Sequence, residues 1–157
     1  MERKTKIDAE EGKQEILITR EFDLPVALLF KAYVEAEIVE QWMGTKVLKL
    51  ESKKHGGYEF ETTDPHGNKY RFSGVIHDFG QDQNITRTFE FENMGLGVQL
   101  EFLEFKKLTE DTSSLGMRVI YESVAQRDQQ LKMPFSQGLN MAHNRLQQVV
   151  SKLNNRS

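Results

Sequence analysis

The sequence has no cysteine among its 157 residues, which excludes disulfides, thiolate nucleophiles and cysteine-ligated metal sites. It also has no hydrophobic run near the roughly 20 apolar residues that a transmembrane helix needs. Residues 1–15 are charged and lack an apolar stretch, so we expect neither a secretory signal nor a membrane anchor. Together these absences favour a cytoplasmic protein that does not insert into a membrane.

An excess of basic residues is also missing. The chain has 21 Lys and Arg against 24 Asp and Glu, a formal net charge of −3, and the two signs are intermixed along the chain. Proteins that bind nucleic acid need a positive field to neutralise phosphates. We therefore expect no nucleic-acid partner.

Motifs for catalysis and metal binding are lacking too. The four histidines are scattered without the spacing of metal ligands, and no serine stands in a G-x-S-x-G elbow. We expect no metal, no cofactor and no catalytic residue. If the protein were an enzyme, only His77, His143 or Glu122 could serve as its acid or base.

The strongest positive signal is a helical periodicity near the end of the chain. It predicts a helix over residues 135–153, roughly 28 Å long at 1.5 Å per residue. The apolar residues that would share one face are Phe135, Leu139, Ala142, Leu146, Val149, Val150 and Leu153. Such a helix needs a partner, because burial of one face offsets only part of the entropy lost on ordering it.

The preceding sequence predicts that partner, an antiparallel sheet. Alternation of apolar and polar residues indicates about seven strands, near residues 14–22, 47–53, 58–62, 70–76, 85–92, 98–102 and 115–121. Two short helices are expected between the first two strands, near residues 26–34 and 37–42, with Gly44 ending the second. We expect an α+β fold with a flexible segment over residues 1–13 and one domain over residues 14–157, in which the curved sheet wraps the long helix.

Several short motifs accompany this order of elements. They are Arg20-Glu21-Phe22-Asp23-Leu24-Pro25, Leu29-Phe30-Lys31-Ala32-Tyr33, Glu40-Gln41-Trp42-Met43-Gly44, Gly56-Gly57-Tyr58-Glu59-Phe60, Asp64-Pro65-His66-Gly67, Phe72-Ser73-Gly74 and Arg87-Thr88-Phe89. In this order the chain resembles the activator of heat shock protein 90 ATPase homologue (AHSA-type) family of the START-like, or SRPBCC, superfamily. The resemblance implies the helix-grip fold, which is also the fold of birch-pollen-allergen-like proteins.

The resemblance also implies a function. In this superfamily the space between sheet and long helix commonly holds a small hydrophobic molecule, so we expect a non-catalytic domain that binds a lipid or an aromatic metabolite. The expected ligand-binding residues are Trp42, Tyr58, Phe60, Phe72, Arg87, Phe89, Phe91, Phe102, Phe135, Leu139 and Met141. For any one aromatic member, packing in the core is the preferred interpretation, whereas for Met133, Phe135 and Leu139 the two interpretations are equally weighted.

Arg87 is the one charge predicted on the inward face, in phase with Phe89 and Phe91. It could orient a ligand carboxylate. The preferred interpretation is an ion pair with Glu101, Glu104 or Glu122, because a buried charge needs a partner.

Two other functions remain open. One is a co-chaperone-like interaction that stimulates the heat shock protein 90 ATPase, in which Glu90, Glu92 and Glu101 would attract a basic partner. The other is an enzyme of the cyclase type acting in the same cavity. Unpaired strand edges leave both a monomer and a homodimer open.

Overall fold

The computed structural model describes residues 3–132 and 135–154. Its strands are β1 (Lys6–Asp8), β2 (Glu15–Phe22), β3 (Lys46–Leu50), β4 (Gly57–Thr63), β5 (Lys69–Gly80), β6 (Asn84–Phe91), β7 (Val98–Lys107) and β8 (Ser113–Ile120). Its helices are α1 (Val26–Val34), α2 (Ala36–Met43), α3 (Val124–Lys132) and α4 (Phe135–Asn154). None of these helices is long and apolar enough to cross a lipid bilayer.

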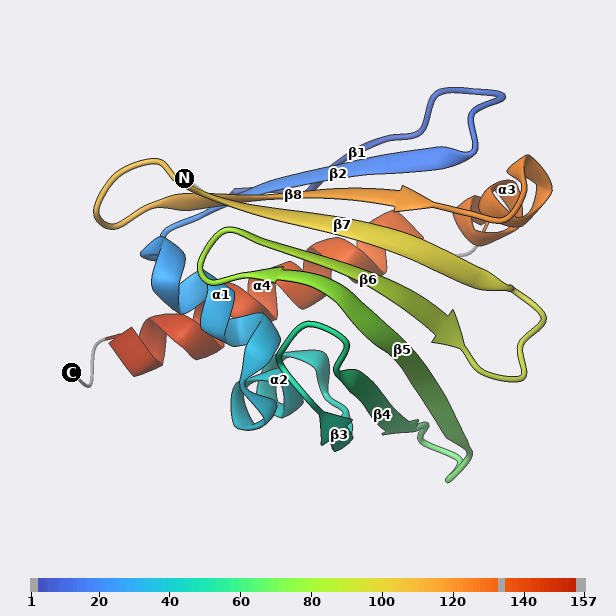
Figure 1. Ribbon diagram of the computed structural model, residues 1–157, viewed down its shortest axis with the longest axis horizontal. Helices are drawn as coiled ribbons and strands as arrows, with labels where there is room; N and C mark the ends of the chain where they lie inside the picture. The colour runs from blue at the N-terminus through green and yellow to red at the C-terminus, as the bar shows by residue number, and fades with distance from the viewer. Residues whose placement is uncertain (1–2, 133–134, 155–157) are drawn as a thin grey trace.

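The eight strands form one antiparallel sheet in the order β1-β2-β8-β7-β6-β5-β4-β3. Figure 1 shows the sheet curving over α4, with α1 and α2 at one end of the molecule and α3 at the other. Strand β2 lies next to the β1 edge, so helices α1 and α2 carry the chain from one side of the sheet to the opposite edge at β3. The predicted helix-grip architecture is confirmed.

Helix α4 has the apolar face that its periodicity predicts. Leu146 and Val150 are completely buried, and Ala142, Val149 and Leu153 pack against the same core. Helix α2 lies against α4 and ends at Gly44, which has a positive φ of 63° as a helix-terminating glycine often does. The end of the molecule around α1 and α2 is therefore closely packed.

Two segments differ from the sequence-based expectation. Residues 6–8 lie in the segment expected to be flexible, yet they form β1 and pair with β2. Thr5, just before β1, is held to α4, because its backbone N–H donates to Asn140 Oδ1 at 3.0 Å. The sheet therefore has eight strands rather than about seven.

The second difference is α3, a helix where none was expected. Its sequence has little apolar periodicity, and its one fully buried side chain is the charged Arg127. The guanidinium of Arg127 donates to the backbone carbonyls of Glu10 and Glu15, at 2.6 and 3.3 Å. Helix α3 is thus anchored by polar contacts to the chain around β1 and β2, which no hydrophobic pattern could predict.

The buried apolar residues fall into two clusters. The larger lies between the sheet, α1, α2 and α4, and contains Phe30, Trp42 and Phe60. The smaller contains Val119 and Tyr121 at the opposite end, where α3 and the start of α4 pack against it. The candidate site lies at this second end.

Candidate functional site

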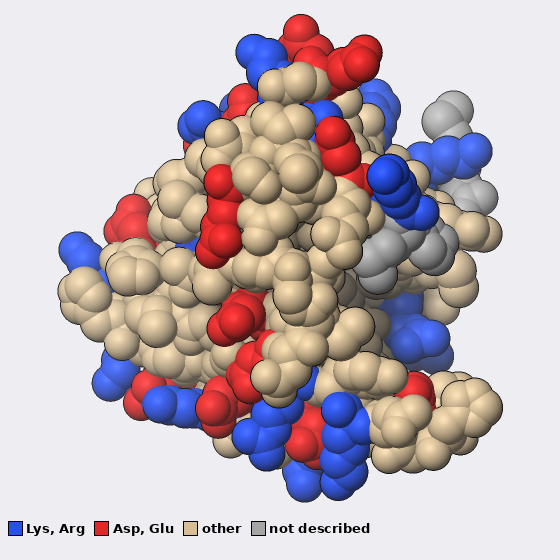
Figure 2. Space-filling view, turned by 90° about the vertical axis from the view of Figure 1, so that its right-hand side faces the viewer, with Lys and Arg blue, Asp and Glu red and all other residues tan. Residues whose placement is uncertain are grey.

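An apolar hollow of about 290 Å³ lies at the end of the inner face of the sheet, where the sheet meets α3 and α4. Its lining comes from β5, β6, β7, the turn at residues 92–97, α3 and α4, and consists of Phe72, Phe89, Phe91, Met94, Leu96, Gly97, Gln99, Gln130 and Phe135. Figure 2 views the molecule from this end: uncharged side chains occupy much of the middle of the surface, with several Asp and Glu among them, and most Lys and Arg lie nearer its margins. Every residue that lines the hollow is uncharged.

Three phenylalanines form its wall. Phe72 on β5 stands opposite Phe91 on β6, and their rings meet edge to face with centroids 4.5 Å apart. Phe89 is two residues along β6 from Phe91, so it shares the inner face, and its ring lies 5.5 Å from that of Phe72. Such an array offers a flat apolar ligand both ring faces and ring edges.

Beside this wall, on the same face of the sheet, lies a buried ion pair. Arg87 Nε donates to Glu101 Oε1 at 2.8 Å, and only 12% and 6% of the two side chains are exposed. Burial opposes the charge on Arg87, but the Glu101 carboxylate outweighs this and the pKa of Arg87 rises. The preferred prediction, an ion pair with Glu101, Glu104 or Glu122, is confirmed with Glu101 as the partner, so the charge of Arg87 is already matched within the protein.

Gln99 connects the ion pair to the hollow. It lines the hollow, and its Nε2 donates to Glu101 Oε2 at 2.7 Å. Across the sheet Gln99 lies opposite Phe89, and Glu101 lies opposite Arg87. A polar row therefore runs beside the aromatic wall, on the same face of the sheet.

Tyr58 on β4 packs against the Arg87 end of this polar row. Its hydroxyl donates to the carbonyl oxygen of Thr88, and its ring lies 5.4 Å from the guanidinium carbon of Arg87. Gly74 makes this contact possible, since a Cβ there would lie 2.7 Å from the Tyr58 hydroxyl and 2.0 Å from the Thr88 carbonyl oxygen. Burial raises the pKa of Tyr58, which keeps the phenol protonated.

Two other tyrosine hydroxyls are buried without a hydrogen-bond partner in the described part of the chain. They belong to Tyr33 on α1 and to Tyr121 just after β8. Burial raises the pKa of both, so both remain hydrogen-bond donors at neutral pH. Tyr33 packs against Trp42 and Phe105 in the larger cluster, whereas Tyr121 belongs to the cluster beside the hollow.

Comparison with known proteins identifies the family. A family model described as "Activator of Hsp90 ATPase homolog 1-like protein" (AHSA1) matches residues 23–151. The chain belongs to this family. No curated protein matches its sequence.

Solved structures agree with the family assignment at the level of the fold. A protein from Arthrobacter aurescens has a TM-score of 0.84 at 18% identity, with 94% of this chain and 91% of that chain covered. For a protein from Rhodobacter sphaeroides the TM-score is 0.85 at 16% identity, with 94% and 99% covered. A protein from Mycobacterium smegmatis has a TM-score of 0.82 at 20% identity, with 92% and 94% covered. At these identities the likeness shows the AHSA1 fold and no more.

The structure brings together four of the predicted site residues. Phe72, Phe89, Phe91 and Phe135 line the hollow of this AHSA1 chain. Leu139, one helical turn after Phe135, packs against the smaller apolar cluster. Met133 lies outside the described residues.

Three predicted wall residues lie in the larger core cluster instead. Trp42, Tyr58 and Phe60 are at most 5% exposed and do not line the hollow. The indole N–H of Trp42 donates to the carbonyl oxygen of Ala32 at 2.6 Å, which ties α2 to α1. For these residues the core interpretation fits the structure.

Phe102 and Met141 are on the wrong side of their elements for the predicted wall. The inward residues of β7 are Gln99, Glu101, Leu103 and Phe105, so Phe102 faces outward, with the Arg118 guanidinium 5.8 Å from its ring centroid. The strand has apolar residues on both faces, and a buried glutamate made the true inner face look polar. Met141 is 62% exposed because it lies two residues from Leu139, on the opposite side of α4.

The three acid or base candidates lie elsewhere. His77 and Glu122 are exposed, and Glu122 accepts from the backbone N–H of Val98 at 3.2 Å, which fixes the turn at residues 92–97. His143 is buried in α4 beside Thr5. None of the three lines the hollow.

Five lining residues were not predicted, namely Met94, Leu96, Gly97, Gln99 and Gln130. Four of them come from the turn and from α3, which lack a clear periodicity. Gln99 had a usable signal, because it alternates with Glu101 on the strand that pairs with Arg87.

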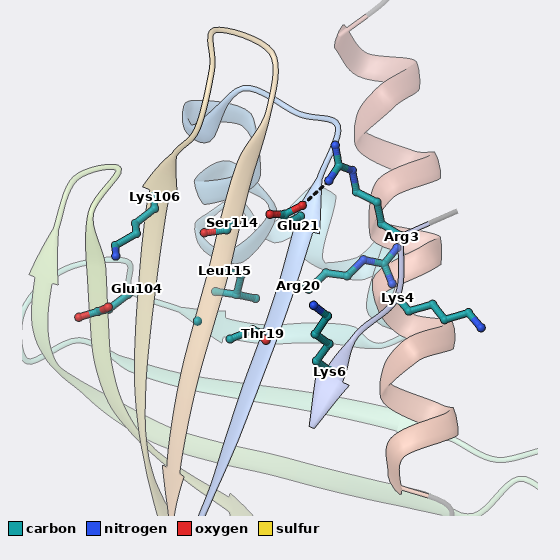
Figure 3. Close-up of a pocket in the computed structure, with 11 residues that line it drawn as sticks. Arg3, Lys4, Lys6, Thr19, Arg20, Glu21, Glu104, Lys106, Ser114 and Leu115 are labelled. Carbon is teal, nitrogen blue, oxygen red and sulfur yellow. Dashed lines mark hydrogen bonds and ion pairs between the residues drawn. The ribbon is translucent and has the colours of Figure 1, made fainter. Parts of the chain in front are cut away.

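A second, larger hollow of about 510 Å³ lies beside β1, over the β2, β8 and β7 strands. Figure 3 shows its charged lining, in which Arg3 forms an ion pair with Glu21. The side chains of Glu104 and Lys106 extend into the lining from β7. On the outer face of the sheet, Thr19, Gly116 and Glu104 form one row and Glu21, Ser114 and Lys106 the next. Its charged rim makes it a poorer match than the first hollow for an apolar molecule.

Proposed function

We propose that this AHSA1 protein binds a small hydrophobic molecule in the hollow between the sheet and α4, without catalysing a reaction. The observation that carries the proposal is the three-phenylalanine wall, which lines an open hollow. Water against aromatic rings is readily displaced by an apolar ligand, and this displacement drives binding.

The volume of the hollow limits the size of the ligand. Pockets for drug-sized molecules span roughly 300–1,000 Å³, and this one has about 290 Å³. That volume favours an aromatic metabolite with one or two rings over a long-chain lipid or a sterol.

The chemistry of the lining supports binding without catalysis. Its side chains are those of Phe, Met, Leu and Gln, none of which exchanges protons near neutral pH. The nearest charges, Arg87 and Glu101, are bonded to each other behind Gln99.

A pair of neighbouring substitutions on α3 tests the proposal. Gln130→Trp places an indole at the hollow, whereas Gln129→Trp places the same side chain on the exposed side of α3. Isothermal titration with neutral one- and two-ring aromatic compounds should show binding to the parent protein and to Gln129→Trp, and at least tenfold weaker binding to Gln130→Trp. Equal affinities for both variants would place the ligand elsewhere.

A second candidate rests on the description of the family, which names activation of the Hsp90 ATPase. The predicted acidic surface for this role is smaller than expected, because Glu101 is buried against Arg87 and only Glu90 and Glu92 are partly exposed. The ATPase rate of the host's large heat-shock chaperone, measured with and without this protein, tests the candidate. A stimulated rate that Gln130→Trp leaves unchanged would favour the interaction over ligand binding.

A further inference from the structure

The orientation of the Gln99 amide is fixed by chemistry. The Glu101 carboxylate can only accept hydrogen bonds, so the amide group that faces it at 2.7 Å must be the NH₂. The carbonyl oxygen Oε1 is then left as an acceptor on a residue that lines the hollow. In the described part of the chain no group donates to this oxygen, so it is available to a ligand.

The Tyr121 hydroxyl supplies the complementary group. Leu100 lies opposite Ile120 in the β7–β8 ladder, so the next positions, Gln99 and Tyr121, are neighbours on the inner face. Tyr121 is 4% exposed, and within the described ranges its hydroxyl has no hydrogen-bond partner. A buried donor without a partner is costly, and proteins rarely retain one without a reason.

Tyr121 does not itself line the hollow, but it adjoins two residues that do, Gln99 and Phe135. Phe135 lines the hollow and also packs against the cluster that contains Tyr121. The Glu101 carboxylate that holds Gln99 also acts on Tyr121, where burial first and then this negative charge raise the pKa. A donor and an acceptor are therefore presented side by side next to an aromatic wall.

We propose that the ligand carries a neutral hydroxyl group, which accepts a hydrogen bond from Tyr121 and donates one to Gln99 Oε1. The ligand class is an aromatic alcohol or phenol of one or two rings. This inference rests on the proposed function and adds the polar group that the site selects.

The same geometry selects against a carboxylate. An anion cannot donate to Gln99 Oε1, and Arg87, the cation of the polar row, is already bonded to Glu101. Moving an anion next to the buried Glu101 would also add repulsion between like charges. The site therefore does not use Arg87 to anchor an acid.

Three probes of similar shape test the proposal in the full chain. 2-Naphthol has the hydroxyl, 2-methylnaphthalene replaces it with a methyl group of similar size, and 2-naphthoate replaces it with an anion. At neutral pH we expect the protein to bind 2-naphthol about tenfold more tightly than 2-methylnaphthalene, and 2-naphthoate most weakly. Isothermal titration gives the three affinities.

Conservative variants identify the groups responsible. Tyr121→Phe and Gln99→Met should each reduce the preference for 2-naphthol over 2-methylnaphthalene to about twofold or less. Tyr33→Phe is the matched control, because it removes the other buried hydroxyl without a described partner, away from the hollow, and should leave the preference unchanged.

The outcomes separate this inference from the function on which it rests. If 2-naphthol and 2-methylnaphthalene bind equally, or Tyr121→Phe keeps the parent preference, the hydroxyl inference is wrong and hydrophobic binding stands. Tightest binding of 2-naphthoate would also overturn it. If no neutral aromatic compound binds the parent protein, both proposals fail.

Discussion

His143 couples the stability of the protein to pH. It is 1% exposed in α4, and its Nδ1 shares a hydrogen bond of 2.6 Å with the Thr5 hydroxyl. Burial, and then the nearby positive charge of Arg20, lower the pKa of His143 from 6.5 to about 3. Below pH 6.5 the unfolded chain therefore takes up a proton that the folded chain does not. The stability that a neutral His143 contributes is complete above this pH and is lost as the pH falls towards 3.

We expect the titration of His143 to lower the free energy of unfolding by roughly 2–3 kcal/mol as the pH falls from 6.5 to about 4.5. His143→Gln removes this titration and keeps a polar partner for Thr5, so its stability should fall less on acidification than that of the parent protein. Urea denaturation at pH 7 and pH 4.5 measures the difference. His66→Gln, in the exposed turn between β4 and β5, should follow the parent profile. Equal pH dependence of His143→Gln and the parent would contradict the account.

At the scale of elements, Gly74 decides how β4, β5 and β6 meet. A Cβ at Gly74 would lie 2.0 Å from the Thr88 carbonyl oxygen, which is backbone and cannot move aside cheaply. Gly74→Ala should therefore destabilise the protein by at least about 2 kcal/mol. Gly116 on β8 is the control, because nothing lies within 4 Å of its Cβ position, and Gly116→Ala should change stability by no more than about 0.5 kcal/mol. Equal effects in urea denaturation would show that the Gly74 contact does not limit packing.

The elements were predictable where one face of the sequence was clearly apolar. The spacing of Leu139, Leu146 and Val150 located α4, and the alternation in residues 85–91 located β6 with Arg87 on its inner face. The prediction failed where side-chain chemistry replaced periodicity. Helix α3 is anchored through Arg127 to backbone carbonyls, and β1 is held next to α4 through Thr5.

At the scale of the whole molecule, the site arises from segments of different predictability. The phenylalanine wall comes from strands with clear alternation and was predicted, whereas the turn at residues 92–97 and α3 have no pattern that places them over it. The assignment of Phe102 to the wall failed because β7 has apolar residues on both faces, and the inner face carries Glu101, whose burial depends on its partner Arg87 on another strand. Which residues surround a hollow follows from tertiary packing more than from local sequence.

The central claim is that the hollow beside Phe72, Phe89 and Phe91 holds a small neutral aromatic molecule. Native mass spectrometry of the protein purified from its own host tests this most directly, followed by denaturation and analysis of any released compound. We predict a stoichiometric apolar compound on the parent protein and on Gln129→Trp, and its absence from Gln130→Trp. A compound-free mass for the parent, together with no thermal shift across a panel of neutral aromatic molecules, would contradict the claim.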